Sequence, residues 1–169
     1  SVLVCSTGVI GHLMPMDKIE AGIPKLVENL RADASEEFGR AILTTDLALK
    51  SHAVEIQTEK GVVTIGGACK GSGMIHPNMA TMLAFITTDL ALPIDFFAEF
   101  RADIADSFNA ITVDGDTSTN DTCILLANGM SGLKYEDLTL TEQGEFRAAL
   151  MLVMKELAKD TVRDGEGAT

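Results

Sequence analysis

The sequence contains few aromatic side chains and no tryptophan. Phe, Tyr and Trp together make up 5% of its 169 residues, and only one of these residues is Tyr. Proteins that bind single-stranded nucleic acids usually present several aromatic rings on which bases stack. The composition therefore disfavours a protein that recognises bases or sugars by stacking.

Basic residues are also scarce. Lys and Arg number 13 against 25 Asp and Glu, which gives a formal net charge of -12. Nucleic acids and anionic membrane surfaces attract proteins that carry a basic face. We therefore expect neither of them as a partner. The sequence also lacks an apolar run of the ~20 residues that a transmembrane helix needs, so no such helix is predicted.

Cysteine and histidine are too few and too scattered for a metal or disulfide framework. The three cysteines are Cys5, Cys69 and Cys123. Their odd number and wide spacing disfavour paired disulfides, and no C-x-x-C motif accompanies the three dispersed histidines. We expect buried, reduced cysteines in a reducing compartment, most simply the cytoplasm, with no metal and no cofactor.

The remaining composition is typical of one folded domain. Hydrophobic residues make up 46% and charged residues 22%, and a chain of this length can bury roughly 70% of its unfolded surface. The chain starts without Met, directly on the apolar run 2–5, and closes on the Gly-rich turn 164–169. These two ends predict the central part of a longer polypeptide.

Strand and helix patterns alternate irregularly along the chain. Apolar runs predict strands over 2–5, 53–57, 62–65, 82–86 and 122–127, with a hairpin turn at 58–61. Apolar residues at helical spacing predict helices over 18–31, from Ser35 onward, over 94–108 and over 145–158. Pro24 is expected to divide the first helix, and Ser35 to cap the second. The mixture favours a layered α+β or α/β domain.

Two patterns within these elements add detail. The helix over 145–158 carries an apolar stripe that we expect in the core: Phe146, Leu150, Val153, Met154 and Leu157. The hexapeptide Thr44–Leu49 recurs as Thr87–Leu92. This repeat suggests two equivalent strand ends, although chance similarity is an alternative.

The segment Asp114–Asp121 has oxygen-bearing side chains at alternate positions, as a calcium-binding EF-hand loop does. However, Thr119 stands where that loop needs Gly, and Leu125 stands where it needs Glu. We therefore reject an EF-hand. A polar turn held by side-chain hydrogen bonds and a wall of an active site are the two interpretations left.

Three other polar segments are weak signals when taken singly. The glycine-rich stretch Lys70–Gly73 is neither a Walker loop nor G-x-G-x-x-G. It is either a surface turn with a solvated Lys or a site at which Lys binds a carboxylate. Ser6–Gly8 is either an ordinary turn or an oxyanion hole, since backbone N–H groups and a hydroxyl can converge there. Thr81 directly precedes the apolar run 82–86 and is predicted to be the first residue of that strand.

Several segments together resemble one enzyme family. They are residues 6–11, 15–19, 42–46, 70–86, 113–121 and 164–169. Their order and sequence, above all Met79-Ala80-Thr81-Met82-Leu83 within 70–86, resemble the glutamate N-acetyltransferase family. These are the ornithine acetyltransferases, also called bifunctional arginine biosynthesis proteins. The resemblance implies an α/β sandwich of the N-terminal-nucleophile-like kind, incomplete at both ends of this chain.

The resemblance also implies a precursor that cuts itself between Ala80 and Thr81. Residues 1–80 would be the end of an α chain and residues 81–169 the start of a β chain. Both would belong to one acetyltransferase domain, in a heterotetramer of two α and two β chains. The freed Thr81 amine, whose ordinary pKa is about 7.7 to 8.0, would activate the Thr81 hydroxyl as the nucleophile.

By the same resemblance, five further positions take part in the reaction. Thr7 and Gly8 would form the oxyanion hole, and Lys70 would pair with a substrate α-carboxylate. One residue of the pair Thr44–Thr45 would line the pocket, and Glu166 would bind the substrate amine. The Asn and Thr substrate ligands near the C-terminus of the family have no counterpart in this chain.

The implied reaction moves an acetyl group from N-acetylornithine to glutamate in arginine biosynthesis, through an acetyl ester on Thr81. Some family members also use acetyl-CoA as a donor, and the sequence leaves that open here. Two alternatives stand beside this function. The first is an N-terminal-Thr amidohydrolase or aminopeptidase, in which water is the acceptor. The second is an inactive, folded fragment or structural module.

Overall fold

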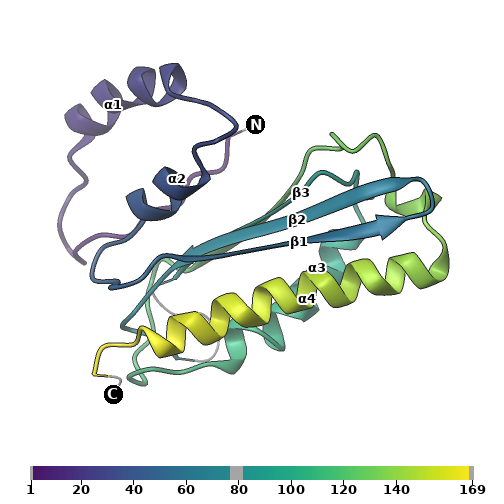
Figure 1. The fold of residues 1–169 in the computed structure, drawn as a ribbon. Coiled ribbons are helices and arrows are strands. Elements are labelled where there is room, and N and C mark those ends of the chain that lie inside the picture. Colours follow the sequence, from purple (N-terminus) through teal and green to yellow (C-terminus); the bar gives the residue numbers. More distant parts are fainter. Residues whose placement is uncertain (1, 77–81, 168–169) are drawn as a thin grey trace.

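The computed structural model describes residues 2–76 and 82–167. A four-stranded sheet of order β1-β2-β3-β4 forms its centre. The first three strands pair antiparallel, whereas β3 and β4 pair parallel. Helices lie on both faces of this sheet (Figure 1). The predicted mixed α/β architecture is therefore confirmed.

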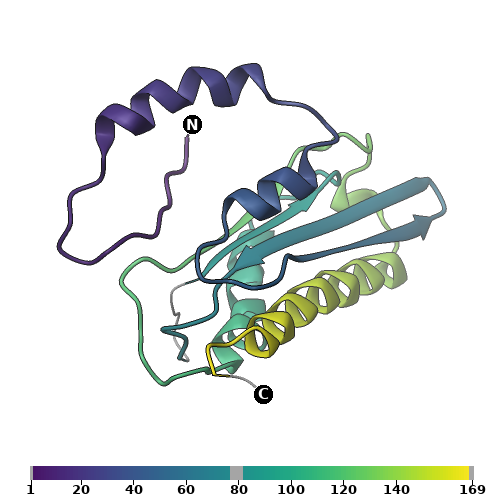
Figure 2. The same cartoon turned by 60° about the vertical axis from the view of Figure 1, so that its left-hand side comes forward.

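The helices divide unequally between the two faces. The long helix α4 (Leu140–Arg163) and α3 (Phe96–Ala105) cover one face (Figure 1). The short helix α2 (Ser35–Ala41) lies over the opposite face, while α1 (Met16–Glu28) stands away from the sheet (Figure 2). The main core consequently lies between the sheet and the pair α3 and α4.

The strands β1 (Lys50–Thr58) and β2 (Gly61–Lys70) form the predicted hairpin. Thr58 holds its turn, since its hydroxyl donates to the Gly61 carbonyl oxygen at 2.7 Å. The pairing runs from Thr58 opposite Gly61 to Lys50 opposite Cys69. Both strands are therefore longer than their apolar runs alone indicated.

The strand β3 (Leu83–Thr88) joins the hairpin to β4 (Thr122–Ala127). It pairs antiparallel with residues 65–70 of β2 on one side and parallel with β4 on the other. A parallel pair needs a long crossover connection, and here that connection contains α3. Both predicted strands are confirmed, with β3 displaced by one or two residues at its ends.

The helix α4 begins five residues before the predicted position. Thr139 caps it, because its hydroxyl accepts a hydrogen bond from the Glu142 amide at 3.2 Å. The Glu142 carboxylate accepts one in return from the Thr139 amide at 2.8 Å, which completes a capping box. The five residues of its predicted apolar stripe are each 0% or 1% exposed, which confirms their place in the core.

The close packing of α4 on β2 depends on Gly67. A Cβ atom at Gly67 would lie 2.8 Å from a methyl carbon of Leu157 and 3.0 Å from one of Val153. Real Cβ atoms essentially never come within 3.0 Å of another heavy atom, so a side chain here would force at least the Leu157 side chain of α4 to move. Burying one Leu or Val side chain contributes roughly 1.5 to 3 kcal/mol, and α4 buries several.

The predicted strand over 2–5 is wrong. Val2, Leu3 and Val4 are 87%, 69% and 89% exposed, and the segment has no regular secondary structure. An apolar run becomes a strand only where another strand supplies backbone hydrogen bonds. Within the described ranges this segment pairs with no strand.

Three expectations about helices also need correction. Pro24 lies inside an undivided α1, and Ser35 is the first residue of α2 rather than its cap, a position that Ala34 occupies. The helix predicted over 94–108 is shorter, because α3 ends at Ala105 and a separate 3₁₀ turn begins at Phe108. Its apolar side nevertheless joins the core, with Phe100 and Phe108 buried.

The repeated hexapeptide does not mark two equivalent strand ends. Thr87 and Thr88 end β3, whereas Thr44–Leu49 forms the loop between α2 and β1. The Leu at the second position after the Thr pair shows the difference most clearly, since Leu47 is 92% exposed and Leu90 is 0% exposed. Tertiary surroundings therefore decide the structure of this hexapeptide.

Candidate functional site

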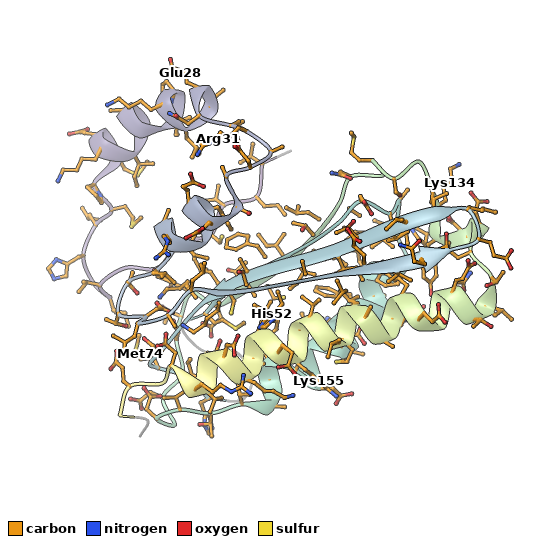
Figure 3. All side chains as sticks on the ribbon, in the orientation of Figure 1. Glu28, Arg31, His52, Met74, Lys134 and Lys155 are labelled. Carbon is orange, nitrogen blue, oxygen red and sulfur yellow. The ribbon has the colours of Figure 1, made fainter. Side chains whose placement is uncertain are left out.

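A cavity of about 420 Å³ opens at one end of the sheet. The loop before β1, the loop after β2, the turn after α4 and the N-terminal segment surround it. Figure 3 shows Met74 at this end, near the last turn of α4, and Lys134 at the opposite end. The residues of its lining that the sequence had assigned to the site are Thr7, Gly8, Thr44, Thr45, Lys70 and Glu166.

Lys70 is the last residue of β2 and is only 3% exposed. Its Nζ donates to the Thr44 hydroxyl at 2.8 Å and lies 3.8 Å from a carboxylate oxygen of Asp46. The alternative of a solvated Lys in a surface turn is therefore wrong. An ammonium group has three donors, so Lys70 retains donor capacity for an anionic ligand in the cavity.

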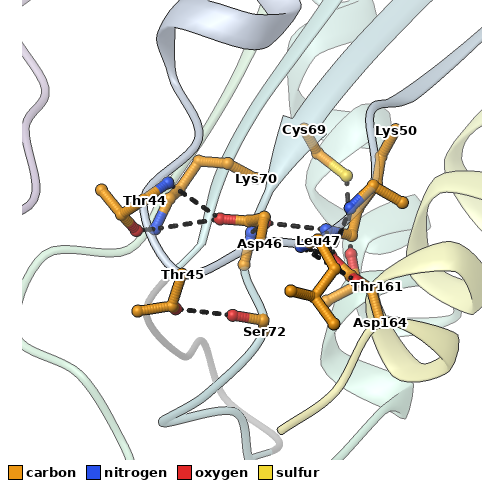
Figure 4. Close-up of polar contacts among 12 residues, drawn as sticks. Thr44, Thr45, Asp46, Leu47, Lys50, Cys69, Lys70, Ser72, Thr161 and Asp164 are labelled. Atoms are coloured by element: carbon orange, nitrogen blue, oxygen red, sulfur yellow. Dashed lines mark hydrogen bonds and ion pairs between the residues drawn. The ribbon is translucent and has the colours of Figure 1, made fainter.

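The loops on either side of Lys70 are tied to each other. The Thr45 and Ser72 hydroxyl oxygens lie 2.7 Å apart, and Asp46 accepts a hydrogen bond from the Gly71 amide at 2.6 Å. Gly71 has a φ of 151°, which glycine tolerates far better than other residues. These bonds join the loop that carries Thr44, whose hydroxyl accepts from the Lys70 ammonium, to the loop after β2 (Figure 4).

Glu166 lies on the turn that follows α4. Its amide donates to the Ser72 carbonyl oxygen at 2.7 Å, which attaches this turn to the loop after β2. Its carboxylate packs against Gly73, where an added Cβ would lie 3.1 to 3.3 Å from the three carboxylate atoms. Gly73 thus leaves room for the acidic group at the cavity wall.

Asp114 is the residue of the segment 114–121 that reaches the cavity. It lines the cavity and accepts hydrogen bonds from the amides of Met74 and, at 2.9 Å, Ile75. Burial alone raises the pKa of Asp114, but these bonds and one from the Asp116 amide lower it below its usual value. In the described ranges, no three acidic, His or Cys residues are grouped to hold a metal ion.

Thr7 and Gly8 reach the cavity from an exposed segment rather than from the end of a buried strand. This segment contacts the loop before β4, because the Asn120 side chain donates to the Ser6 carbonyl oxygen at 3.1 Å. Of the expected site, only Ala80 and Thr81 lie outside the described residues.

The described chain resumes at Met82, directly after Thr81. The Met82 amide donates to the Asp121 carboxylate at 2.8 Å, and the Met82 side chain is buried. Burial raises the pKa of Asp121, against the lowering effect of this hydrogen bond. The start of β3, which follows the expected nucleophile in the sequence, is thus anchored.

Three charged residues beside the cavity form a cluster that we call the buried triad: Asp46, Lys50 and Asp164. The Lys50 Nζ donates to Asp46 at 2.7 Å and to Asp164 (Figure 4). Burial alone raises the pKa of Asp46, yet hydrogen bonds from Lys50, Gly71 and Thr44 lower it. Burial alone lowers the pKa of Lys50, but its two carboxylate partners raise it. Both groups are therefore charged at neutral pH.

The buried triad gives the protein a measurable acid sensitivity. Because folding lowers the pKa of Asp46 from 3.8, ionised Asp46 stabilises the fold above that pH, and this stabilisation disappears as the pH falls through the lowered value. We expect Asp46→Asn in the full-length protein to lower the free energy of unfolding at neutral pH and to flatten its fall below about pH 4. Urea unfolding at a series of pH values measures both effects.

Asp33→Asn is the control for this measurement, because the Asp33 side chain is 83% exposed. Exposed ion pairs contribute little to stability, so the control should leave the acid limb of the curve unchanged. Equal acid limbs for Asp46→Asn and Asp33→Asn would contradict the assignment.

Sequence reasoning missed the buried triad as a unit. Asp46 and Asp164 stand within segments that carry the family resemblance, but neither was given a role, and Lys50 lies in none of these segments. The available signal was the Thr-Thr-Asp sequence followed four residues later by Lys. Such a signal is too common to be informative without the contact between Lys50 and the distant Asp164.

Two other cavities contain none of the expected site residues. One of about 430 Å³ lies between α2 and the outer face of the sheet, beside Phe38 and Phe85. Another of about 480 Å³ lies between α1 and α2, beside Leu26 and Leu30.

In the part of the chain that the structure describes, no helix has the length and apolar character that crossing a membrane requires.

Comparisons with known proteins identify the family of this chain. All 169 residues match the model of the ArgJ family. The chain is 49% identical to the arginine biosynthesis bifunctional protein ArgJ of Geobacillus kaustophilus, 50% identical to that of Bacillus subtilis and 52% identical to that of Streptococcus mutans. These matches cover 98% or 99% of this chain and 41% of each relative. The chain therefore spans about two fifths of the length of these curated relatives, and it belongs to the ArgJ family.

Proposed function

We propose that the protein is an acetyltransferase of arginine biosynthesis, which moves an acetyl group from N-acetylornithine to glutamate. One observation carries the proposal. The six expected site residues within the described chain all line one cavity, although the first and last are separated by 159 positions (7 and 166). The names of the relatives, arginine biosynthesis bifunctional proteins, point to the same pathway.

The charges of the cavity suit amino-acid substrates. In this proposal the Lys70 ammonium pairs with an α-carboxylate, which both N-acetylornithine and glutamate possess. The Glu166 carboxylate binds a cationic amine, such as the side-chain amine of ornithine. Charge-assisted hydrogen bonds of this kind are about twice as strong as neutral ones, so opposite charges at the two positions would orient the substrate.

The proposed reaction begins with self-cleavage between Ala80 and Thr81. The Thr81 amine then takes the proton of the Thr81 hydroxyl as the oxygen attacks the acetyl carbonyl carbon. The Thr7 hydroxyl and the Gly8 N–H would stabilise the resulting oxyanion. The amide C–N bond breaks, ornithine leaves with a proton, and the acetyl group stays as an ester on Thr81. Glutamate's amine attacks that ester and restores the free hydroxyl.

Two structural proposals accompany this reaction. The described sheet and its helices would be part of an N-terminal-nucleophile-like sandwich. Residues 1–80 and 81–169 would belong to the α and β chains of one acetyltransferase domain, assembled as two α and two β chains. Acetyl-CoA is a second candidate donor, because the relatives are named bifunctional.

The proposed function is tested with the full-length protein and isotope-labelled glutamate. N-acetylornithine is the donor, and mass spectrometry follows labelled N-acetylglutamate and free acetate. We expect labelled N-acetylglutamate to form in step with ornithine. Release of acetate without N-acetylglutamate would favour the amidohydrolase alternative, and absence of both products would favour the structural module. Products from the full-length protein but not from residues 1–169 alone would favour the inactive fragment. Replacing the donor with acetyl-CoA tests the second activity.

Lys70→Ala and Glu166→Ala should chiefly weaken substrate binding. Losing a hydrogen bond to a charged group costs about 1.5 to 3 kcal/mol, so we expect KM to rise about 10- to 150-fold. The effect of Glu166→Ala should be larger for N-acetylornithine, whose free, cationic side-chain amine Glu166 would bind. Steady-state kinetics on full-length variants measures these changes.

Lys134→Ala is the matched control, since Lys134 is exposed and lies at the opposite end of the sheet (Figure 3). Circular dichroism should show that all three variants are folded. Unchanged KM values in folded Lys70→Ala and Glu166→Ala variants would contradict the roles given to these residues.

A further inference from the structure

Lys50 is the central residue of the buried triad, yet it does not line the cavity. It is the first residue of β1 and is only 1% exposed, so a substrate cannot reach its ammonium group. Both of its carboxylate partners are almost fully buried as well, with Asp46 side-chain exposure of 0% and Asp164 side-chain exposure of 6%. Lys50 thus acts on the cavity only through these partners.

The first partner, Asp46, belongs to the wall that carries Lys70. One oxygen of Asp46 accepts a hydrogen bond from the Gly71 amide at 2.6 Å, and the other accepts one from the Thr44 amide at 3.2 Å. The latter oxygen also lies 3.8 Å from the Lys70 Nζ. The carboxylate of Asp46 therefore fixes the Thr44 hydroxyl and the Lys70 ammonium relative to each other.

The second partner, Asp164, belongs to the wall that carries Glu166, two residues farther along the same turn. Both oxygens of Asp164 accept a hydrogen bond from the Leu47 amide at 3.1 Å, and one of them also accepts a hydrogen bond from the Ala48 amide at 3.4 Å. Asp164 thus attaches the turn after α4 to the loop between α2 and β1. Lys50 contacts both carboxylates at once, at the junction of the two walls (Figure 4).

We propose that Lys50 is a positioning residue that joins the two walls of the cavity and thereby sets the separation between the Lys70 ammonium and the Glu166 carboxylate. This inference rests on the proposed function, in which these two groups bind opposite ends of an amino-acid substrate. Lys50 would then select substrates by the distance between their carboxylate and their amine.

Stability alone is a poor explanation for this cluster. Burying charges costs desolvation energy, and well-packed apolar residues of similar volume often stabilise a protein equally well or better. What apolar residues cannot supply is a directional link to two carboxylates on separate segments. Together with Lys70, the triad contains two cations and two anions, so the junction is electrically balanced as well as directional.

The test uses a charge-balanced double variant of the full-length protein, Lys50→Met/Asp164→Asn. It removes one cation and one anion and leaves the Asp46–Lys70 pair intact, so no uncompensated buried charge remains. We expect a folded protein in which the amides of Leu47 and Ala48 exchange faster with deuterium. A displacement of about 1 Å in a substrate-positioning group can cost on the order of 100-fold in rate, so kcat/KM should fall about 10- to 100-fold, mainly through KM.

Asp160→Asn is the matched control. Asp160 lies one helical turn before Asp164 and has its own partners, a hydrogen bond with His52 and an ion pair with Arg163, each at 2.7 Å. It does not line the cavity. We expect this variant to lose some stability while keeping wild-type kinetics and wild-type exchange at Leu47 and Ala48.

The outcomes separate the two proposals. Wild-type protein that transfers no acetyl group overturns the proposed function. A different outcome overturns the role of Lys50 and leaves the proposed function standing. In that outcome the wild-type protein is active, the double variant folds, and the kcat/KM of the double variant lies within about twofold of the Asp160→Asn value. If the double variant does not fold, Lys50→Arg replaces it in the test, because arginine keeps the charge but carries a larger head group. Unchanged KM values in a folded Lys50→Arg variant would also overturn the inference.

Discussion

Replacing Thr81 with Ala in the full-length protein is expected to leave the chain uncut and to abolish acetyl transfer. In the proposed mechanism, the hydroxyl of Thr81 attacks the carbonyl carbon of Ala80 during self-cleavage and later carries the acetyl group. Alanine can do neither. Intact-mass measurement reports the cleavage, and N-acetylglutamate formation reports the activity. No other proposed substitution should have a larger effect.

Two variants make this result specific. Thr81→Ser retains a hydroxyl and should still be cut, although more slowly. Thr87→Ala removes an exposed hydroxyl from β3, the strand that follows Thr81 in the sequence, and should be cut at the wild-type rate. A Thr81→Ala protein that still splits after Ala80 would refute the proposed cleavage chemistry.

Replacing Thr7 with Val should give the next largest effect. Valine preserves the shape of threonine and removes only the hydroxyl that would bind the oxyanion. Because the negative charge develops in the transition state, the loss should lower kcat more than it raises KM. Removal of one oxyanion-hole donor typically costs on the order of 10²- to 10³-fold in kcat, and we expect a loss of that size on fully processed enzyme.

Thr7→Ser is the matched control, because it keeps the hydroxyl and loses only a methyl group. Its kcat should stay near the wild-type value. Self-cleavage of Thr7→Val should slow less than acetyl transfer, since the Ala80 carbonyl need not occupy the position of the substrate carbonyl. A wild-type kcat for Thr7→Val would make Thr7 an ordinary residue of the cavity wall.

The elements with strong local signals were predictable from the sequence. The hairpin of β1 and β2 combines two apolar runs with a short turn, and α4 carries its apolar stripe over many residues. The failures concern elements that depend on distant partners. The run 2–5 looks like a buried strand in composition, but a strand also needs a neighbour, which composition does not supply.

The repeated hexapeptide shows the same limit within one chain. In the first copy, Asp46 accepts hydrogen bonds from Lys50 and Gly71, which hold a loop. In the second copy, Asp89 accepts a hydrogen bond of 2.8 Å from the amide of Thr64, a residue of the neighbouring strand β2. Identical residues thus have different partners, and the partners determine the backbone. Local propensity alone could not distinguish the two copies.

The candidate site was predictable because several short segments resemble one family in the same order. That resemblance identified residues on the cavity surface, such as Lys70 and Glu166. It did not identify what holds them, because Lys50 and Ser72 act through contacts with residues far away in the sequence. Such contacts follow from the fold and have no pattern of their own in the sequence.

The pairing of β2 with β3 has a consequence for the proposed cleavage. A cut after Ala80 would place β1 and β2 in one polypeptide and β3, β4 and α4 in the other. Six residue pairs of the β2–β3 ladder, together with α4 packed on β1 and β2, would hold the two polypeptides together without a covalent link. The uncut precursor would fold in a first-order reaction, whereas the separated pieces would have to find each other. Maturation would thus convert a reversible, concentration-independent folding reaction into a bimolecular one, so the processed protein would recover from denaturation less readily as it is diluted.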